Sequence, residues 1–290
     1  MPAARIPTIA VSSWSIHRTI GLSWWDSPVA PAERKEAWGA GDLAILDLPA
    51  AAARHGIRQL HLCHFHVESR DQPWLGEFRA ALADAGVTLS MLLIDDGDIA
   101  HPTEHARDVA WVESWIETAA ALGARSARVV AGKQKPSPDA LNLSAGNLKA
   151  LARRGRAAGV RIVTENWLDL TPGPDEIEYL MDASGDDLGL LADFGNWKGG
   201  TKYADLERVL ARAEDTHAKA SFSAPGVIDA DDFGKCLAAC DAAGYAGPYT
   251  LINEGGDTDE WEAIGIEKRF VEDWFAVAPA TKPETAQIKT

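Results

Sequence analysis

The feature that most constrains this chain is the alternation of short β-rich runs with longer amphipathic runs. Parallel strands need crossover connections of a dozen or more residues, so this alternation is typical of βα units. Eight strands are predicted at Pro7–Ser13, Arg58–His64, Thr88–Asp95, Ser126–Val130, Arg161–Glu165, Leu188–Asp193, Asp215–Ala220 and Pro248–Asn253. Helices are predicted at Leu43–His55, Pro73–Ala85, Thr103–Leu122, Leu143–Ala158, Asp175–Ala183, Tyr203–Ala213, Ala230–Ala243 and Asp259–Val277.

A glycine follows several of the predicted helices, where a left-handed residue commonly ends a helix. These glycines are Gly56, Gly86, Gly123, Gly159 and Gly244. Eight βα units without a domain-scale linker favour one α/β domain, a single (β/α)8 TIM barrel over residues 1–277. An open doubly wound sheet is the alternative arrangement of the same units. Residues 278–290, rich in Ala, Pro, Thr and Lys, are expected to form a flexible tail.

Charge and composition exclude several function classes. The formal net charge of -15 opposes binding to nucleic acid and to anionic membrane surfaces, which recruit proteins through Lys and Arg. The three cysteines show neither a disulfide framework nor zinc-ligand spacing. Because no run of about 18 apolar residues and no secretory leader occurs, a cytoplasmic protein is expected.

The longest irregular stretch follows the first predicted strand, at residues 14–42. It contains Trp24, Trp25 and Trp38. Loops of this length inside a compact domain are usually functional, so we expect this stretch to cover the active site.

Chemistry-bearing side chains stand at the ends of four successive predicted strands. These are Glu165, Asp193, His217 and Glu254, separated by 28, 24 and 37 residues. Strand ends converge on one face of a barrel, and converging carboxylates need a compensating cation. The oxygen-rich set favours one divalent metal ion, Mn, Mg or Co, with Zn less favoured. The alternative is that each residue caps a helix or forms a salt bridge at its strand end.

These motifs resemble the xylose isomerase-like barrels, a family that includes sugar isomerases, ketose 3-epimerases and endonuclease IV. The resemblance covers nearly the whole chain and is most marked from Glu165 to Gly256. It implies that Glu165, Asp193, His217 and Glu254 are metal ligands. Arg128 also fits the family's fourth strand, whereas His61 stands where a Glu is common.

Two positions depart from the epimerases of this family. Asn196 stands where they carry a His, three residues after the sixth-strand Asp. In the seventh strand, Ala220 replaces the final Asp of a His-x-Lys-Asp motif. The metal ligands are therefore retained, while the side chains expected around the substrate have changed.

The resemblance implies proton transfer at a carbon beside a carbonyl, through an enediolate. Glu165 and Glu254 are the candidate catalytic acid and base, since carboxylates on two sides of a substrate can remove and return a proton. Aromatic faces pack against sugar rings, and polar side chains bond to hydroxyls. The residues expected to contact substrate are Trp14, His61, His64, His66, Trp167, Asn196, Trp197 and Lys219.

Three functions remain open from the sequence. The first is a metal-dependent sugar isomerase or epimerase of carbohydrate metabolism, with manganese as the expected ion. The second is a lyase, dehydratase or hydrolase acting on an oxidised sugar, glycoside or cyclitol with the same residues. The third is a non-catalytic barrel that binds a ligand. A second metal held by the three histidines would suggest phosphodiester chemistry, which the acidity opposes. The expected partner is a small polyhydroxylated molecule, and a homo-oligomer is left open.

Overall fold

A computed structural model describes residues 6–36, 41–254 and 258–276. In these ranges, eight parallel strands close into a barrel in the order β1, β12, β9, β8, β7, β6, β5, β4. The strands are β1 (Ile9–Ser12), β4 (Gln59–Cys63), β5 (Thr88–Ile94), β6 (Ser126–Val129), β7 (Arg161–Glu165), β8 (Leu188–Asp193), β9 (Asp215–Ala220) and β12 (Tyr249–Asn253). Because β1 pairs with both β12 and β4, the sheet has no free edge. The predicted (β/α)8 barrel is confirmed.

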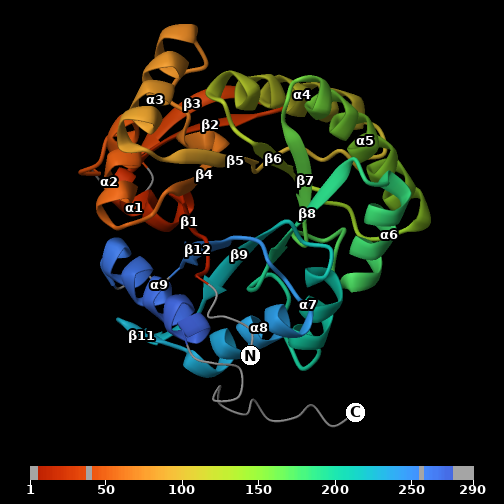
Figure 1. Cartoon of the computed structure of the whole chain (residues 1–290). Helices are drawn as coiled ribbons and strands as arrows, with labels where there is room; N and C mark the ends of the chain where they lie inside the picture. The colour runs from red at the N-terminus through yellow and green to blue at the C-terminus, as the bar shows by residue number, and fades with distance from the viewer. Residues whose placement is uncertain (1–5, 37–40, 255–257, 277–290) are drawn as a thin grey trace.

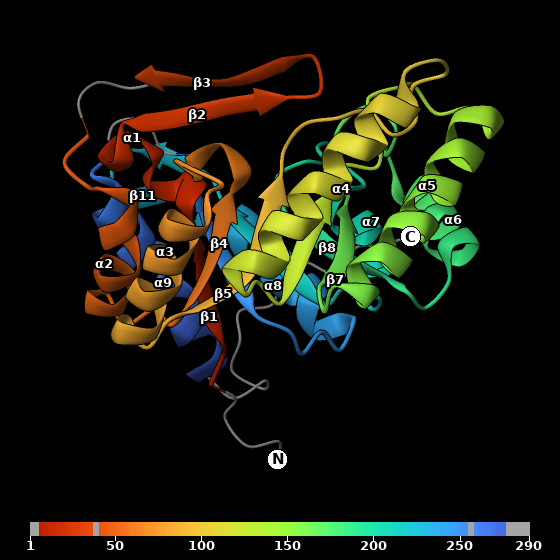
Figure 2. The same cartoon turned by 90° about the horizontal axis from the view of Figure 1, so that it is seen from above.

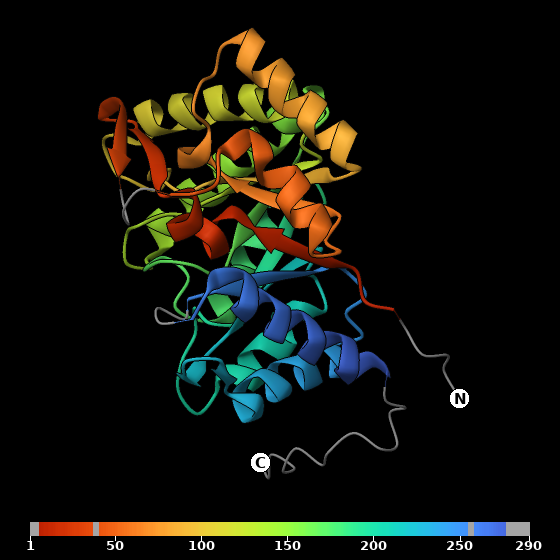
Figure 3. The same cartoon turned by 90° about the vertical axis from the view of Figure 1, so that its left-hand side faces the viewer.

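Helices surround the strands as an outer ring (Figure 1). They are α2 (Leu48–Arg54), α3 (Gln72–Ala85), α4 (His105–Leu122), α5 (Pro138–Ala157), α6 (Pro174–Ser184), α7 (Lys202–Leu210), α8 (Ala230–Ala242) and α9 (Glu260–Ala276). Shorter turns of helix are η1 (Ser13–Ile16), α1 (His17–Ile20), η2 (Ile45–Asp47) and η3 (His64–His66). The last helix, α9, packs against β12 and against η1, the turn that follows β1 (Figure 3), so the first and last βα units are neighbours.

Local sequence signals explain most helix boundaries. Gly86 and Gly123 end α3 and α4 in the left-handed conformation, as predicted. Helix α5 begins at Pro138, five residues before the predicted start. The Ser137 side chain accepts a hydrogen bond from the Ala140 backbone N–H there, and Pro138 suits the first helical turn.

None of the helices in the described ranges is long and apolar enough to cross a membrane.

The stretch predicted to be irregular contains an antiparallel hairpin, β2 (Leu22–Ser27) and β3 (Ala30–Glu36). That prediction was wrong because neither strand shows a clear apolar alternation. The hairpin lies across the carboxyl end of the barrel strands (Figure 2). Trp25 on β2 stacks on Phe65 of η3, with ring centroids 4.5 Å apart. The hairpin therefore covers the site face, while Trp38 and the predicted tail lie outside the described residues.

The strands separate two cores. Strand residues that face outward, such as Leu60 and Leu62, pack in the main hydrophobic core with the helices. The barrel interior holds a smaller apolar cluster, formed by Cys63, Phe65, Met91, Leu93, Val163 and Leu191. Because successive strand side chains alternate between faces, polar residues two positions away share the barrel interior. The interior thus holds both apolar and polar side chains.

Candidate metal centre and active site

A cavity of about 370 Å³ lies at the carboxyl end of the barrel. Its lining residues come from all eight barrel strands and from the hairpin and turns that follow them. They are Ser12, Trp14, Trp25, Cys63, Phe65, Leu93, Asp95, Arg128, Glu165, Trp167, Asp193, Asn196, His217, Lys219, Ile252 and Glu254. Strand alternation explains several pairs, since His217 and Lys219 are two residues apart on β9 and point into the same space.

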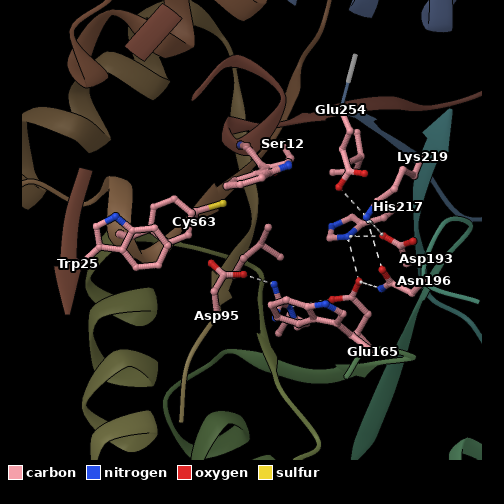
Figure 4. Close-up of a pocket in the computed structure, with 16 residues that line it drawn as sticks. Ser12, Trp25, Cys63, Asp95, Glu165, Asp193, Asn196, His217, Lys219 and Glu254 are labelled. Atoms are coloured by element: carbon pink, nitrogen blue, oxygen red, sulfur yellow. Dashed lines mark hydrogen bonds and ion pairs between the residues drawn. The ribbon is translucent and has the colours of Figure 1, made fainter. Parts of the chain in front are cut away.

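Three of the predicted metal ligands form a compact buried group. One ligand atom from each of Glu165, Asp193 and His217 lies within 4.8 Å of the others. His217 Nδ1 is 3.3 Å from Glu165 Oε1 and 3.6 Å from Asp193 Oδ2. Figure 4 shows the imidazole facing both carboxylates. Two carboxylate oxygens and one ring nitrogen therefore surround a common point.

The charges in this group strongly perturb one another. Burial alone would lower the pKa of His217, but the carboxylates of Glu165 and Asp193 raise it to about 9. Burial would raise the pKa of Asp193, yet the Lys219 ammonium and the His217 ring hold it below its ordinary value. Without an ion, the imidazole therefore carries a proton on the nitrogen that faces the carboxylates.

Glu254 lies at the cavity rim, outside the compact group. Its side chain is 53% exposed, and its Oε1 accepts a hydrogen bond from Lys219 Nζ at 3.1 Å. Lys219 Nζ is also 3.5 Å from Asp193 Oδ2. Burial lowers the pKa of Lys219, but Asp193 and Glu254 more than reverse this and raise it. Lys219 thus bridges the buried group and the rim carboxylate.

A second buried cation, Arg128 on β6, anchors the other side of the group. Its Nε is 3.1 Å from Glu165 Oε2, and its Nη2 donates to Asp95 Oδ1. The guanidinium also lies 4.7 Å from the ring centroid of Trp167. Burial would lower the pKa of Arg128, yet Asp95 and Glu165 raise it. Asp95 and Arg128 are therefore additional candidates for functional residues of this site.

The donor set and the charge balance both fit one divalent cation. The cavity is lined by four carboxylates and by the cations Arg128 and Lys219, so two negative charges remain when His217 is neutral. The protonated His217 ring of the ion-free site offsets one of them. Two carboxylates and one imidazole with open positions suit Mn, Mg, Co or Zn. The cationic side chains therefore relieve only part of the repulsion among the carboxylates. Glu165, Asp193 and His217 would hold the ion, and Glu254 stands at the rim.

Aromatic side chains form the wall opposite the charged group. Trp25 and Phe65 are stacked, and the Trp14 ring lies edge-on to Phe65 with centroids 6.2 Å apart. Figure 4 shows Trp25 at the opposite end of the cavity from Asp193 and Glu254. Trp14 and Trp167 were predicted, whereas Phe65 and Cys63 were missed. Cys63 lies two residues after the inward-facing His61, so strand alternation would have placed it in the cavity.

The remaining predicted substrate contacts have different positions. Asn196 lines the cavity, and its Nδ2 donates to Glu165 Oε1 at 3.1 Å. Trp197 lines an adjoining outer cavity of about 830 Å³. None of the three histidines lines the inner cavity as the described residues form it. His61 is buried beneath His217, with ring nitrogens 3.3 Å apart.

The other two histidines are also fully buried. His64 Nδ1 lies 3.3 Å from Asp95 Oδ2, and its Nε2 lies 3.2 Å from the Asp26 carbonyl oxygen. His66 Nδ1 lies 2.8 Å from Ser13 Oγ. These contacts hold the turn after β4 in place, so we do not extend the substrate-binding proposal to these side chains.

Several solved structures share this fold at low sequence identity. A xylose isomerase-like TIM barrel protein from Mycobacterium smegmatis, in complex with magnesium, is 16% identical, with 95% of this chain and 99% of that chain covered and a TM-score of 0.64. An L-ribulose 3-epimerase is 17% identical, with 92% and 94% covered and a TM-score of 0.66. A protein described as the probable 3-DHS dehydratase of petrobactin synthesis in Bacillus anthracis is 12% identical, with 91% and 98% covered and a TM-score of 0.66.

These identities establish a common fold and nothing finer. No curated protein matches the sequence. The model of one family, described as "Xylose isomerase-like TIM barrel", matches residues 49–274, which is most of the chain. The protein therefore belongs to the xylose isomerase-like TIM barrel family.

Proposed function

We propose that this protein is a divalent-metal-dependent sugar isomerase or epimerase. The observation that carries the proposal is the buried group of Glu165, Asp193 and His217 at the floor of a cavity in which carboxylates outnumber cationic side chains. Solved structures of the same fold include an L-ribulose 3-epimerase and a D-psicose 3-epimerase, and another contains magnesium. The family therefore favours chemistry on small sugars.

The ion would be held by Glu165, Asp193 and His217. When bound, it polarises the carbonyl of a substrate and stabilises negative charge on adjacent oxygens. The protein fixes these ligands firmly. Asn166 accepts a hydrogen bond from the Asp193 backbone N–H at 2.7 Å, and Gly195 N–H donates to Asp193 Oδ1 at 2.6 Å. Such contacts hold the carboxylate in one orientation before substrate arrives.

Glu165 and Glu254 are the proposed proton-transfer pair. Figure 4 shows them on opposite sides of His217 and Asp193, so a substrate between them would present one face to each. Glu165 is held by Arg128 and Asn196, which fix its position. Glu254 is exposed enough to exchange a proton with solvent, and Lys219 orients it. One carboxylate removes the proton beside the carbonyl, and the other returns a proton to the opposite face.

The test is a panel of ketoses and aldoses incubated with Mn²⁺-loaded protein in D₂O. An isomerase or epimerase forms a product of unchanged composition, which incorporates deuterium at the carbon beside the carbonyl. Glu254→Gln should abolish epimerisation and leave exchange into one epimer, because Glu165 still serves one face. Glu77→Gln on the exposed face of α3 is the matched control. Turnover without any deuterium incorporation would contradict the proposal.

A second candidate is elimination of water from an oxidised sugar or cyclitol. Asn196 favours it, because the amide occupies the position of an epimerase His and donates to Glu165. Elimination begins with the same proton removal but expels a hydroxyl group in place of accepting a proton. Product mass separates the two, since dehydration lowers it by one water and epimerisation leaves it unchanged.

A further inference from the structure

A polar layer lies inside the barrel directly beneath the proposed metal centre. It consists of His61, Asp215 and Thr250, whose exposed fractions are 0%, 6% and 0%. The interior of such barrels is usually filled by branched apolar side chains. A polar group buried without a partner lowers stability by a few kcal/mol, so a polar layer here calls for a specific arrangement of hydrogen bonds.

Strand geometry places this layer in line with a metal ligand. Asp215 and His217 are two residues apart on β9, so both side chains point into the barrel. Thr250 on β12 is the register partner of His217. His61 reaches the same axis from β4. The layer therefore continues from the ligand into the barrel, away from the substrate cavity.

The contacts form a chain from Asp215 to His217. His61 Nε2 is 3.2 Å from Asp215 Oδ2, and His61 Nδ1 is 3.3 Å from His217 Nε2. Asp215 Oδ1 accepts hydrogen bonds from the Thr250 hydroxyl at 2.9 Å and from the Thr216 backbone N–H at 2.8 Å. His217 Nδ1 then faces Glu165 and Asp193 on the cavity side.

With a neutral His61 ring, only one arrangement of protons satisfies this chain. A carboxylate accepts hydrogen bonds, so Asp215 requires a proton on Nε2 of His61. A neutral imidazole carries its proton on one nitrogen, so His61 Nδ1 is an acceptor. The facing Nε2 of His217 must then be the donor. His217 Nδ1, the atom that faces the two carboxylates, is the nitrogen left free to bind an ion.

We propose that Asp215 and His61 are positioning residues that hold His217 in the tautomer able to bind the metal. This inference rests on the proposed metal centre and extends it to a hydrogen-bonded carboxylate–imidazole–imidazole relay. Partners of this kind fix the orientation and basicity of metal-binding histidines, and their loss typically weakens metal affinity 10- to 100-fold. Apolar side chains could fill this layer of the barrel without needing any hydrogen bonds. The relay explains why the layer contains polar side chains instead.

The first test needs no variant. Two-bond ¹H–¹⁵N correlation spectra of ¹⁵N-histidine-labelled, Mg²⁺-loaded protein distinguish the two tautomers of a neutral ring. We expect His61 to be protonated on Nε2, and His217 to be protonated on Nε2 with Nδ1 bound. A His61 ring protonated on Nδ1, or a His217 ring protonated on Nδ1, would overturn the inference.

The second test is Asp215→Asn, which changes few atoms. The Thr216 N–H and the Thr250 hydroxyl both donate to the Oδ1 position, so the amide oxygen should stay there. The amide NH₂ then faces His61 and forces the opposite tautomer on both rings. Mn²⁺ affinity measured by calorimetry should fall 10- to 100-fold. Ser144→Ala, which removes a buried hydroxyl bonded to the Ala131 carbonyl oxygen, is the matched control and should leave it unchanged.

Asp193→Asn separates failure of the relay from failure of the metal centre. If Asp193→Asn weakens Mn²⁺ binding and Asp215→Asn stays within twofold of the unaltered protein, the relay is wrong and the metal centre stands. If the unaltered protein and Asp193→Asn bind Mn²⁺ equally, both proposals are wrong. Circular dichroism of each variant verifies folding, and the spectra of the unaltered protein decide the question if Asp215→Asn does not fold.

Discussion

Lowering the pH from 8 to 6 is expected to weaken Mn²⁺ binding about 100-fold, because the ion must displace a proton from His217. The pKa of this imidazole is raised to about 9 by Glu165 and Asp193, against the opposing effect of burial. Both pH values lie below 9, so nearly every metal-free molecule carries the competing proton. Each pH unit then changes the apparent affinity about tenfold.

Calorimetry in two buffers of different ionisation enthalpy measures this linkage directly. About one proton should be released per ion bound at pH 7. His217→Gln removes the titrating group, so its weaker binding should lose most of the pH dependence. An apparent Kd that is constant between pH 6 and 8 in the unaltered protein would refute the reasoning.

The same shift affects the stability of the metal-free protein. The folded-state pKa of His217 lies above the ordinary 6.5. The protonated ring therefore stabilises the fold by about 3 kcal/mol, fully below pH 6.5, and this contribution is lost as the pH rises through about 9.

Three further perturbations test other parts of the structure. Burial raises the pKa of Glu267, and both of its carboxyl oxygens lack a hydrogen-bond partner among the described residues. Because the folded form binds the proton more tightly, stability falls as pH rises above about 4.5, and Glu267→Gln should recover up to about 3 kcal/mol at pH 7 in urea unfolding. Arg128→Met leaves Asp95 and Glu165 buried without their cation, so urea unfolding should show a loss of about 3–5 kcal/mol. An unchanged urea midpoint would contradict either expectation. Trp25→Ala removes the stack on Phe65, and steady-state kinetics should show KM raised about fivefold at nearly constant kcat; an unaltered KM would exclude Trp25 from the substrate wall.

The barrel could be predicted because its signals are local. Strands β7, β8 and β9 begin and end at the predicted residues, and β7 and β8 are short apolar or β-rich runs that end at a carboxylate. The hairpin was missed because β3 carries Pro31 and four charged residues, a pattern that does not resemble a strand. Asp26, Ser27 and Pro28 at its turn were the available signal.

Only the site residues that stand at the ends of strands could be predicted from the sequence. Glu165, Asp193 and His217 meet because a barrel brings successive strand ends together. The position of Glu254 could not be predicted, because it depends on the orientation of the Lys219 side chain on a neighbouring strand. The burial of His61 follows from its register across the barrel, since it stands two residues before the cavity-lining Cys63. Pairing of side chains across a barrel leaves no periodic pattern in the sequence.

We propose that one divalent ion lies among Glu165, Asp193 and His217. Anomalous diffraction from crystals soaked in Mn²⁺ tests it most directly. We expect one strong peak within about 2.0–2.3 Å of a carboxylate oxygen from each acid and of His217 Nδ1. An empty site at saturating Mn²⁺, or a peak bound through His217 Nε2, would contradict it.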